Sequence, residues 1–160
     1  KEKCIDALSN NKKLIFCGNG GSAADSIHFA SELTGRFNLE RISLFAISLS
    51  ADIAAITSIA NDFGYEKIFS RQLEGVGEPG DILISLSTSG ESENIIRAVE
   101  LANKKNIITL SLSGKGGGRL RKLSTDCIVV ESNETARIQE MHHFILHQIC
   151  DGIDQYFAKK

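Results

Sequence analysis

The sequence of 160 residues lacks the features of a membrane, secreted or nucleic-acid-binding protein. No apolar run approaches the roughly 20 residues needed to cross a bilayer, and no signal peptide is visible at its start. The 18 basic and 20 acidic residues are interspersed and leave a formal net charge of −2. Proteins that bind nucleic acid or anionic membranes through charge gather basic residues on one surface. The composition therefore predicts no nucleic acid and no membrane as a partner.

Cysteine and proline are also scarce. The four cysteines lie far apart without a CxxC pair, and each falls in an apolar stretch. They are Cys4, Cys17, Cys127 and Cys150. This usage is typical of reduced, buried thiols, so we expect a cytoplasmic protein. The only proline, Pro79, precedes Gly80 in a predicted turn, and no linker or internal repeat is present. Residues 1–160 are therefore predicted to form a single domain.

Short apolar runs alternate with amphipathic segments along the chain, which is typical of a parallel sheet covered by helices. The predicted strands are Leu14–Cys17, Leu44–Ser48, Ile82–Ser87, Ile107–Leu112 and Cys127–Val130. The predicted helices are Ser22–Thr34, Asp52–Ala60, Glu66–Glu74, Ser92–Lys104, Gly118–Leu123 and Glu134–Ala158. The expected fold class is α/β, with three αβα layers in which helices flank a five-stranded parallel sheet.

A glycine-rich loop, Cys17–Ser22 (CGNGGS), follows the first predicted strand. In open α/β sheets, ligands bind beyond the carboxyl ends of the strands. Three glycines let the backbone approach a ligand closely with its N–H groups turned inward, and the start of the next helix favours negative charge. The alternative is a tight strand-to-helix turn that binds nothing.

A second loop, Ser87–Ser92 (STSGES), follows the third predicted strand and carries four hydroxyl groups in six residues. Hydroxyl and backbone N–H groups at a helix start can surround a phosphate without Lys or Arg. A helix cap needs only one hydroxyl, from Ser89 or Ser92, whereas this loop has four. Two loops suited to anions at the same edge of a sheet predict a phosphorylated ligand.

The first loop also fits the loose dinucleotide fingerprint, because Gly18, Gly20 and Ala23 have the spacing GxGxxA. A dinucleotide site needs an acidic residue at the end of the next strand to hold a ribose. The second predicted strand ends in Ser48, and Asp52 comes later, where a helix is expected to start. This interpretation also leaves the second loop unexplained, so it is disfavoured.

Two predicted helices carry histidine beside a carboxylate or an amide. His28 and Glu32 are four residues apart and share a face. On the last helix, Gln139 shares a face with His143, and His143 shares one with His147. Such groups can supply nitrogen and oxygen ligands to zinc, or act as acid and base. The alternatives are a surface His–Glu pair and one buried histidine beside two solvated ones.

Five segments together resemble the phosphoheptose (sedoheptulose-7-phosphate) isomerases of the SIS, or sugar isomerase, class. They are CGNGGSAADSIHFASELTGRF, ANDFGYEKIFSRQLE, STSGESENIIRA, SGKGGGRL and TARIQEMHHFILHQICD. The likeness covers nearly the whole chain in the same order, and CGNGGSAAD followed by HFASELTGRF is a specific signal. The resemblance implies one SIS domain over residues 1–160 with flavodoxin-like topology.

The resemblance also implies roles for individual residues. The sugar-phosphate site would be lined by Asn19, Gly20, Gly21, Ser22, Glu32, Arg36, Asn61, Asp62 and Gln139. The phosphate would be held by Ser87, Thr88, Ser89 and Ser92. One Zn²⁺ ion would be bound by His28, Glu32, Gln139 and His147, of which Glu32 and His147 would form the catalytic pair.

The activity implied by the resemblance converts sedoheptulose 7-phosphate to D-glycero-D-manno-heptose 7-phosphate through an enediol, for bacterial lipopolysaccharide or capsule. Glu32 is then expected to be the base and His147 the acid, while zinc polarises the carbonyl. The resemblance further implies a homotetramer with sites near the subunit interfaces.

The chain departs from the family pattern before its first strand and at Ala136, where some relatives carry Asp. Relatives have a helix ahead of the first strand that is longer than the 13 residues available here, so a missing N-terminal helix is expected. Gln139 and His147 are eight residues apart, about 12 Å along a continuous helix. They would reach one zinc ion through converging side chains or with one ligand from a second copy of the chain.

A function of another class is a non-catalytic SIS-domain binding protein, similar to the initiator-associating protein of bacterial replication. The position that matches Glu32 is not acidic in that relative, so Glu32 favours the enzyme. A regulatory domain that senses sugar phosphates is a third interpretation, although such domains usually accompany a DNA-binding segment that this sequence lacks.

Overall fold

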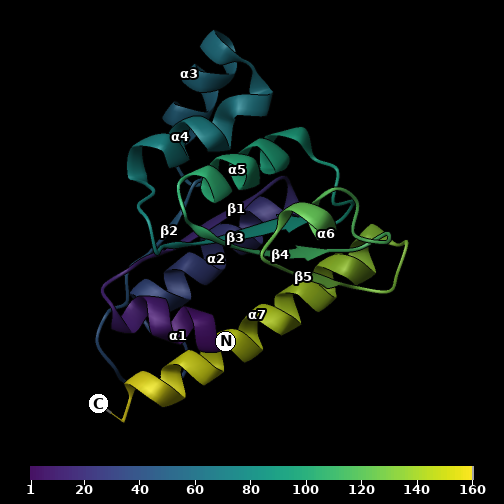
Figure 1. Ribbon diagram of the computed structural model, residues 1–160. Helices are drawn as coiled ribbons and strands as arrows, with labels where there is room; N and C mark the ends of the chain where they lie inside the picture. The colour runs from purple at the N-terminus through teal and green to yellow at the C-terminus, as the bar shows by residue number, and fades with distance from the viewer. Residues whose placement is uncertain (160) are drawn as a thin grey trace.

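Five parallel strands form the centre of the molecule, in the order β2-β1-β3-β4-β5 (Figure 1). The computed structural model describes residues 1–159. The strands are β1 (Leu14–Gly18), β2 (Ala46–Ser48), β3 (Ile82–Ser87), β4 (Ile108–Ser113) and β5 (Asp126–Val129). The helices are α1 (Glu2–Ser9), α2 (Gly21–Thr34), α3 (Ile53–Phe63), α4 (Ile68–Val76), α5 (Glu93–Lys104), α6 (Leu120–Leu123) and α7 (Thr135–Phe157), with a 3₁₀ helix, η1, at Tyr65–Lys67.

Helices cover both faces of the sheet, which confirms the predicted three-layer α/β fold (Figure 1). Successive side chains of a strand point to opposite faces, so the central strands β1 and β3 are buried on both faces. Phe16 and Ile84 pack beneath α1, α2 and α7 on one face. Ile15 and Leu83 pack on the other face beneath α4, α5 and α6, and α3 packs outside α4.

The strands lie within two residues of their predicted bounds, but some elements differ. β2 begins at Ala46 rather than at Leu44. The helix predicted over Glu66–Glu74 consists of η1 followed by α4. The sequence pattern predicted no helix before the first strand, where the structure has α1. The four cysteines are free thiols, but Cys127 is only half-buried because it lies on the edge strand β5.

The chain leaves neighbouring strands toward opposite faces of the sheet. β1 continues into α2 on one face, whereas the adjacent β3 continues into α5 on the other. Such a change of direction opens a crevice at the carboxyl ends of the two strands, where open α/β sheets bind ligands. Both predicted anion-binding loops start at this crevice.

Two buried ion pairs connect neighbouring elements of the fold. Lys13 Nζ lies 2.8 Å from Asp81 Oδ2 at the start of β1 and β3, opposite the crevice. Arg41 Nε lies 2.7 Å from Asp154 Oδ1, and both side chains are fully buried. The Arg41 guanidinium also donates to the backbone oxygen of Glu32 at 2.7 Å, so it ties the end of α2 to α7. Within residues 1–159, no helix combines the length and apolar character of a membrane span.

Candidate active site

The glycine-rich loop turns tightly from β1 into α2. Gly20 has φ +57°, a conformation that side chains rarely adopt. Ser22 N donates to Asn19 O at 3.0 Å, which closes the turn, and the Ser22 side chain is buried. A Cβ atom on Gly21 would lie 2.6 Å from Gln139 Nε2. The glycine-rich loop therefore lies directly against the Gln139 side chain of α7 at position 21.

The second loop gathers serine hydroxyls at the start of α5. Ser87 Oγ lies 3.1 Å from Ser92 Oγ and accepts from Gly90 N at 3.2 Å. Ser89 Oγ accepts from Glu91 N at 3.1 Å. Ser92 is the N-cap residue of α5, yet its side chain makes no capping bond within the described residues. Its hydroxyl contacts Ser87 Oγ instead. The serine hydroxyls therefore form a group of possible hydrogen-bond donors that suits an anion.

Asn94 joins the two loops. Its Nδ2 donates to Asn19 Oδ1 at 2.8 Å, and Asn19 Nδ2 donates back to Asn94 Oδ1 at 2.9 Å. Tyr65 OH donates to the same Asn19 oxygen at 3.0 Å. Because Asn94 is buried at the first turn of α5, it fixes the glycine-rich loop against the serine loop.

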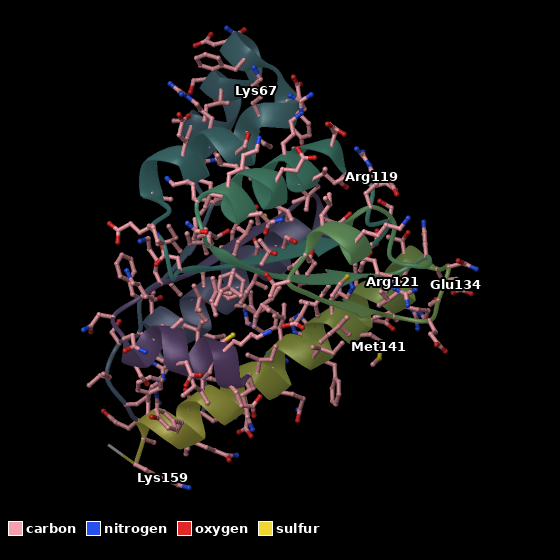
Figure 2. The ribbon with its side chains drawn as sticks, in the orientation of Figure 1. Lys67, Arg119, Arg121, Glu134, Met141 and Lys159 are labelled. Atoms are coloured by element: carbon pink, nitrogen blue, oxygen red, sulfur yellow. The ribbon has the colours of Figure 1, made fainter. Side chains whose placement is uncertain are left out.

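A third glycine-rich segment supports the serine loop from β4. Gly116, Gly117 and Gly118 all have positive φ. Leu120 N donates to Gly90 O at 3.2 Å, and a Cβ on Gly118 would lie 2.6 Å from that oxygen. Arg119 follows at the edge of the molecule (Figure 2). Its backbone N–H and its Nε atom each donate 2.8 Å hydrogen bonds to the carboxylate of Glu91.

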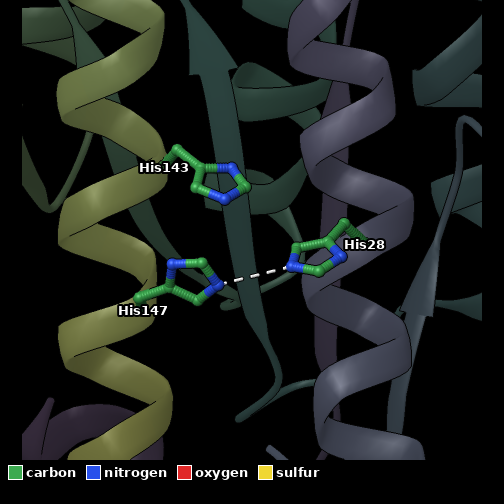
Figure 3. A group of neighbouring side chains, drawn as sticks. All are labelled: His28, His143 and His147. Atoms are coloured by element: carbon green, nitrogen blue, oxygen red, sulfur yellow. Dashed lines mark hydrogen bonds between the residues drawn. The ribbon is translucent and has the colours of Figure 1, made fainter.

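Three histidines meet between α2 and α7. His28 projects from α2, and His143 and His147 project from α7 into the space between the helices (Figure 3). His28 Nε2 lies 3.4 Å from His147 Nε2 and 3.4 Å from Glu32 Oε1. Ligand atoms of the three histidines all lie within 4.8 Å of one another. The structure therefore brings His28, Glu32 and His147 together, and adds His143.

The environment of His147 favours its neutral imidazole. Partial burial lowers the pKa of His147, and His143 and His28 lower it further, while Glu32 and Asp25 act in the opposite direction. A neutral imidazole keeps a lone pair for a metal ion. The cluster is thus electronically suited to bind a cation.

The donor set has the dimensions of a zinc site. In a tetrahedral zinc site with bonds of about 2.1 Å, neighbouring ligand atoms are about 3.4 Å apart. The His28–His147 and His28–Glu32 separations match this value. The residues therefore fit a zinc ion without a change of fold.

The remaining predicted site residues lie outside the cluster of three histidines. Gln139 is half-buried on α7 beside Gly21, nearer to the glycine-rich loop. Asn61 donates to Asp62 Oδ1 at 2.8 Å at the exposed end of α3, shortly before Tyr65. Arg36 is exposed just beyond α2. Thr88 is half-buried in the serine loop.

The structure also places residues at the site that no sequence motif singled out. Asn94 and Tyr65 bind Asn19, and Asp25 accepts from His143 Nδ1 at 2.9 Å. The helical spacing of His143 from His147 already indicated a shared face. The contacts of Asn94 and Tyr65 had no local signal, because they depend on loops that meet only in the folded chain.

A groove links the glycine-rich loop to the cluster. It has a volume of about 380 Å³ and is lined by Gly21, Asp25, Gln139, Glu140 and His143. Gly21 and His28 are seven residues apart, which is about 10 Å along α2. The groove thus joins the glycine-rich loop at Gly21 to the histidine cluster at His143.

Comparison with known proteins agrees with this arrangement. The SIS-domain family model matches residues 1–114, so the fold and the site define a SIS-domain protein. The phosphoheptose isomerase of a Nitratiruptor species is 56% identical over 154 residues, 96% of this chain and 82% of the relative. That of Helicobacter pylori is 52% identical over 98% of this chain and 81% of its own. The chain therefore belongs to the phosphoheptose isomerase family.

Solved structures give the same result. The phosphoheptose isomerase from Neisseria gonorrhoeae superposes with a TM-score of 0.91 at 41% identity. The enzyme from Francisella tularensis superposes with a TM-score of 0.92 at 40% identity. Each alignment covers 96% of this chain and 82% of the solved chain.

Proposed function

We propose that the chain converts sedoheptulose 7-phosphate to D-glycero-D-manno-heptose 7-phosphate, the step that its family membership indicates for bacterial heptose biosynthesis. The observation that carries the proposal is the position of Glu32, whose Oε1 lies 3.4 Å from His28 Nε2, an atom that also lies 3.4 Å from His147 Nε2. The serine hydroxyls cluster at the start of α5, and Gly21 of the glycine-rich loop lines the groove together with His143.

The two ends of this substrate suit the two groups of residues. The reacting carbons C1 and C2 lie at the opposite end of the seven-carbon chain from the phosphate on C7. Ser87, Ser89 and Ser92, with Thr88, bind the phosphate, and Asn19 to Ser22 close over the adjoining part of the chain. Binding energy gained at the phosphate then orients C1 and C2 toward Glu32.

Glu32 is the base of the reaction, and His147 is its acid. Glu32 removes a proton from C1 of the ketose and returns it to C2 of the aldose. His147 supplies a proton to the carbonyl oxygen on C2 and receives one from the hydroxyl on C1, so no net proton is consumed. The two neighbouring groups therefore carry both proton transfers through the enediol.

A zinc ion in this site would be held by His28 and His147, with Glu32 and Gln139 as the further ligands that the resemblance implies. When bound, it polarises the carbonyl as a Lewis acid. Such an ion would also supply positive charge that stabilises negative charge on the substrate oxygens.

Assembly as a homotetramer, and a cytoplasmic location, belong to the same proposal. Met141 and Phe144 are large apolar side chains exposed on α7, and Figure 2 shows Met141 on its outer side. Such a surface suits contact with another copy of the chain. The copies would then meet beside the groove, so sugar hydroxyls would reach residues of two chains, with Arg36, Asn61 and Asp62 available at the surface.

Substitution of the base tests the proposal. Glu32→Gln keeps the size of the side chain but removes the proton acceptor, so turnover should fall by at least about a thousandfold while inorganic phosphate still binds. Glu100→Gln, on the exposed face of α5, is the matched control and should turn over normally.

In deuterated water the wild type should place deuterium at C2 of the aldose. Normal turnover in Glu32→Gln would remove Glu32 as the base, and phosphate binding without turnover in zinc-loaded wild type would indicate a binding protein.

A further inference from the structure

Arg41 binds the last turn of α2, where the backbone carbonyls have no further helical turn to bind them. Its guanidinium donates to Glu32 O at 2.7 Å and to Leu33 O at 2.9 Å. The same group donates at 3.1 Å to the carbonyl of Gly35, the C-cap residue of the helix. A positive charge at a helix C-terminus also interacts favourably with the helix dipole. The backbone of Glu32 is therefore held directly by the Arg41 side chain.

Asp154 connects this end of α2 to α7. Its Oδ1 atom accepts from Arg41 Nε at 2.7 Å, and both side chains are fully buried. Its Oδ2 atom accepts from Asn38 N at 2.7 Å and from Leu39 N at 2.9 Å. The carboxylate therefore binds the guanidinium with one oxygen and the chain that leads from α2 to Arg41 with the other.

The same chain segment contacts His147. The ring of Phe37, which directly precedes Asn38, stacks on the His147 imidazole with centroids 5.1 Å apart and planes inclined by 24°. Asp154 is seven residues from His147, which is two turns and about 10 Å along α7, so the two residues share a face of the helix. The contact between Arg41 and Asp154 therefore reaches His147 both along α7 and through Phe37.

Stability alone does not account for a charged pair at this position. Apolar side chains of similar volume often stabilise a fold as well as a buried ion pair does. They offer no directed hydrogen bonds, whereas arginine presents a rigid planar fork of donors. Here the fork binds Asp154 on α7 and the carbonyls of Glu32 and Leu33 on α2. What the ion pair adds is therefore a defined position of α2 relative to α7.

We propose that Arg41 and Asp154 are positioning residues that set the separation between Glu32 on α2 and His147 on α7. The proposal rests on the proposed function, in which Glu32 and His147 carry the proton transfers. Both members of the ion pair are fully buried, so they act through the groups that they hold and not through contact with substrate. A displacement of reacting groups by about 1 Å lowers a rate by about a hundredfold.

Steady-state kinetics of ion-pair variants test the proposal. Arg41→Lys keeps a positive charge beside Asp154 but replaces the fork by a single ammonium group, so kcat should fall about 10- to 100-fold. KM and the affinity for inorganic phosphate should stay at their wild-type values, because the serine loop lies at the start of α5. The double variant Arg41→Met with Asp154→Leu removes both charges. It should regain much of the stability in urea but not the kcat, a result that a merely structural role would not give.

The second buried ion pair provides a matched control. Lys13 and Asp81 lie at the opposite end of the strands from the crevice, with Lys13 Nζ 2.8 Å from Asp81 Oδ2. Lys13→Met with Asp81→Leu removes a comparable pair of buried charges from an end of the sheet that carries no proposed site residue. This variant should keep the kcat of the wild type.

Crystal structures of the wild type and of Arg41→Lys provide a measurement that does not depend on turnover. The distance between the Glu32 carboxylate and the His147 ring should increase by about 1 Å in the variant. An unchanged distance would overturn the proposal, as would a wild-type kcat in Arg41→Lys or an equal loss of kcat in the control at Lys13 and Asp81. A wild-type chain without isomerase activity would contradict the proposed function, and the two crystal structures would still decide whether Arg41 positions Glu32.

Discussion

Asn19 and Asn94 exchange two amide hydrogen bonds, of 2.9 and 2.8 Å, across the crevice between β1 and β3. Asn94 Oδ1 also accepts from Ile95 N at 2.9 Å, so the buried amide uses both of its ends. This pair is the direct connection between the glycine-rich loop and the serine loop. The shape of the proposed phosphate site therefore depends on the Asn94 side chain, which connects the two loops.

Asn94→Ala should raise the KM for the sugar phosphate more than it lowers kcat. The substitution leaves the amide nitrogen of Asn19 without its partner, which costs about 1–3 kcal/mol, and it lets the two loops separate. Steady-state kinetics and urea unfolding measure the two effects. Asn103→Ala removes comparable side-chain bonds at the far end of α5 and serves as the control. An equal rise in KM in both variants would contradict the role of Asn94.

Gly118→Ala should weaken inorganic phosphate binding at least tenfold. Gly118 has φ +55°, and an added Cβ would lie 2.6 Å from Gly90 O, which is rigid backbone. The serine loop must then move. Gly116→Ala is the matched control, because Gly116 has φ +81° but an added Cβ would meet no atom of residues 1–159 within 4 Å. Both variants carry the backbone strain of about 1 kcal/mol, so a loss of phosphate affinity in both would contradict the collision as its cause.

Asp154→Asn should destabilise the fold by about 3–5 kcal/mol at pH 7, because it leaves the buried guanidinium of Arg41 without its counter-charge. Urea unfolding measures the loss. The double variant Arg41→Met with Asp154→Leu should recover a large part of it, since replacing both charges removes the unpaired ion. If Asp154→Asn unfolds at the wild-type urea concentration, the ion pair does not stabilise α2 against α7.

The Asp154 carboxylate also predicts that the free energy of unfolding decreases at acidic pH. Burial raises the pKa of Asp154, but hydrogen bonds from Leu39 N, Asn38 N and Arg41 outweigh burial and hold the pKa below its ordinary value. Its stabilisation is therefore complete above the unfolded pKa of about 3.9 and is lost as the pH falls through the lower folded pKa. Unfolding measured from pH 6 to pH 2 should show a steeper loss below pH 4 in wild type than in Asp154→Asn. Parallel curves would contradict this assignment.

Zinc should stabilise the folded chain, because a ligand that binds only the native state adds about 2.7 kcal/mol at 100 times its Kd. Thermal unfolding with added Zn²⁺ should show a rise in midpoint that a chelator reverses. Mg²⁺ is the control ion, since it prefers oxygen ligands. His28→Ala should abolish the rise. An equal rise in that variant would place the bound zinc elsewhere.

Much of the fold could be predicted from local sequence. The runs that became β1, β3 and β4 are almost entirely Ile, Leu and Phe with small residues, so their burial on both faces of a sheet follows from composition. α7 was predicted within a residue because its apolar side chains repeat at helical spacing. The short helix α1 was missed, since eight residues give a weak periodic signal.

The sequence predicted the site residues only where the chemical groups are neighbours in the sequence. The serine hydroxyls and the glycines stand side by side in the sequence, and the structure places them at the crevice. Asn94, Tyr65 and Asp25 act through partners 46 to 118 residues away. Such contacts depend on topology, and a single sequence does not display them.

The partners across the α2–α7 gap come from opposite ends of the chain, since His28 and His147 are 119 positions apart. Contacts of such long sequence separation are entropically the costliest to close. Under the proposed function, a chain whose final helix has not docked lacks His147 beside His28 and Glu32, so it should be inactive. Isomerase activity would then report complete folding of the chain.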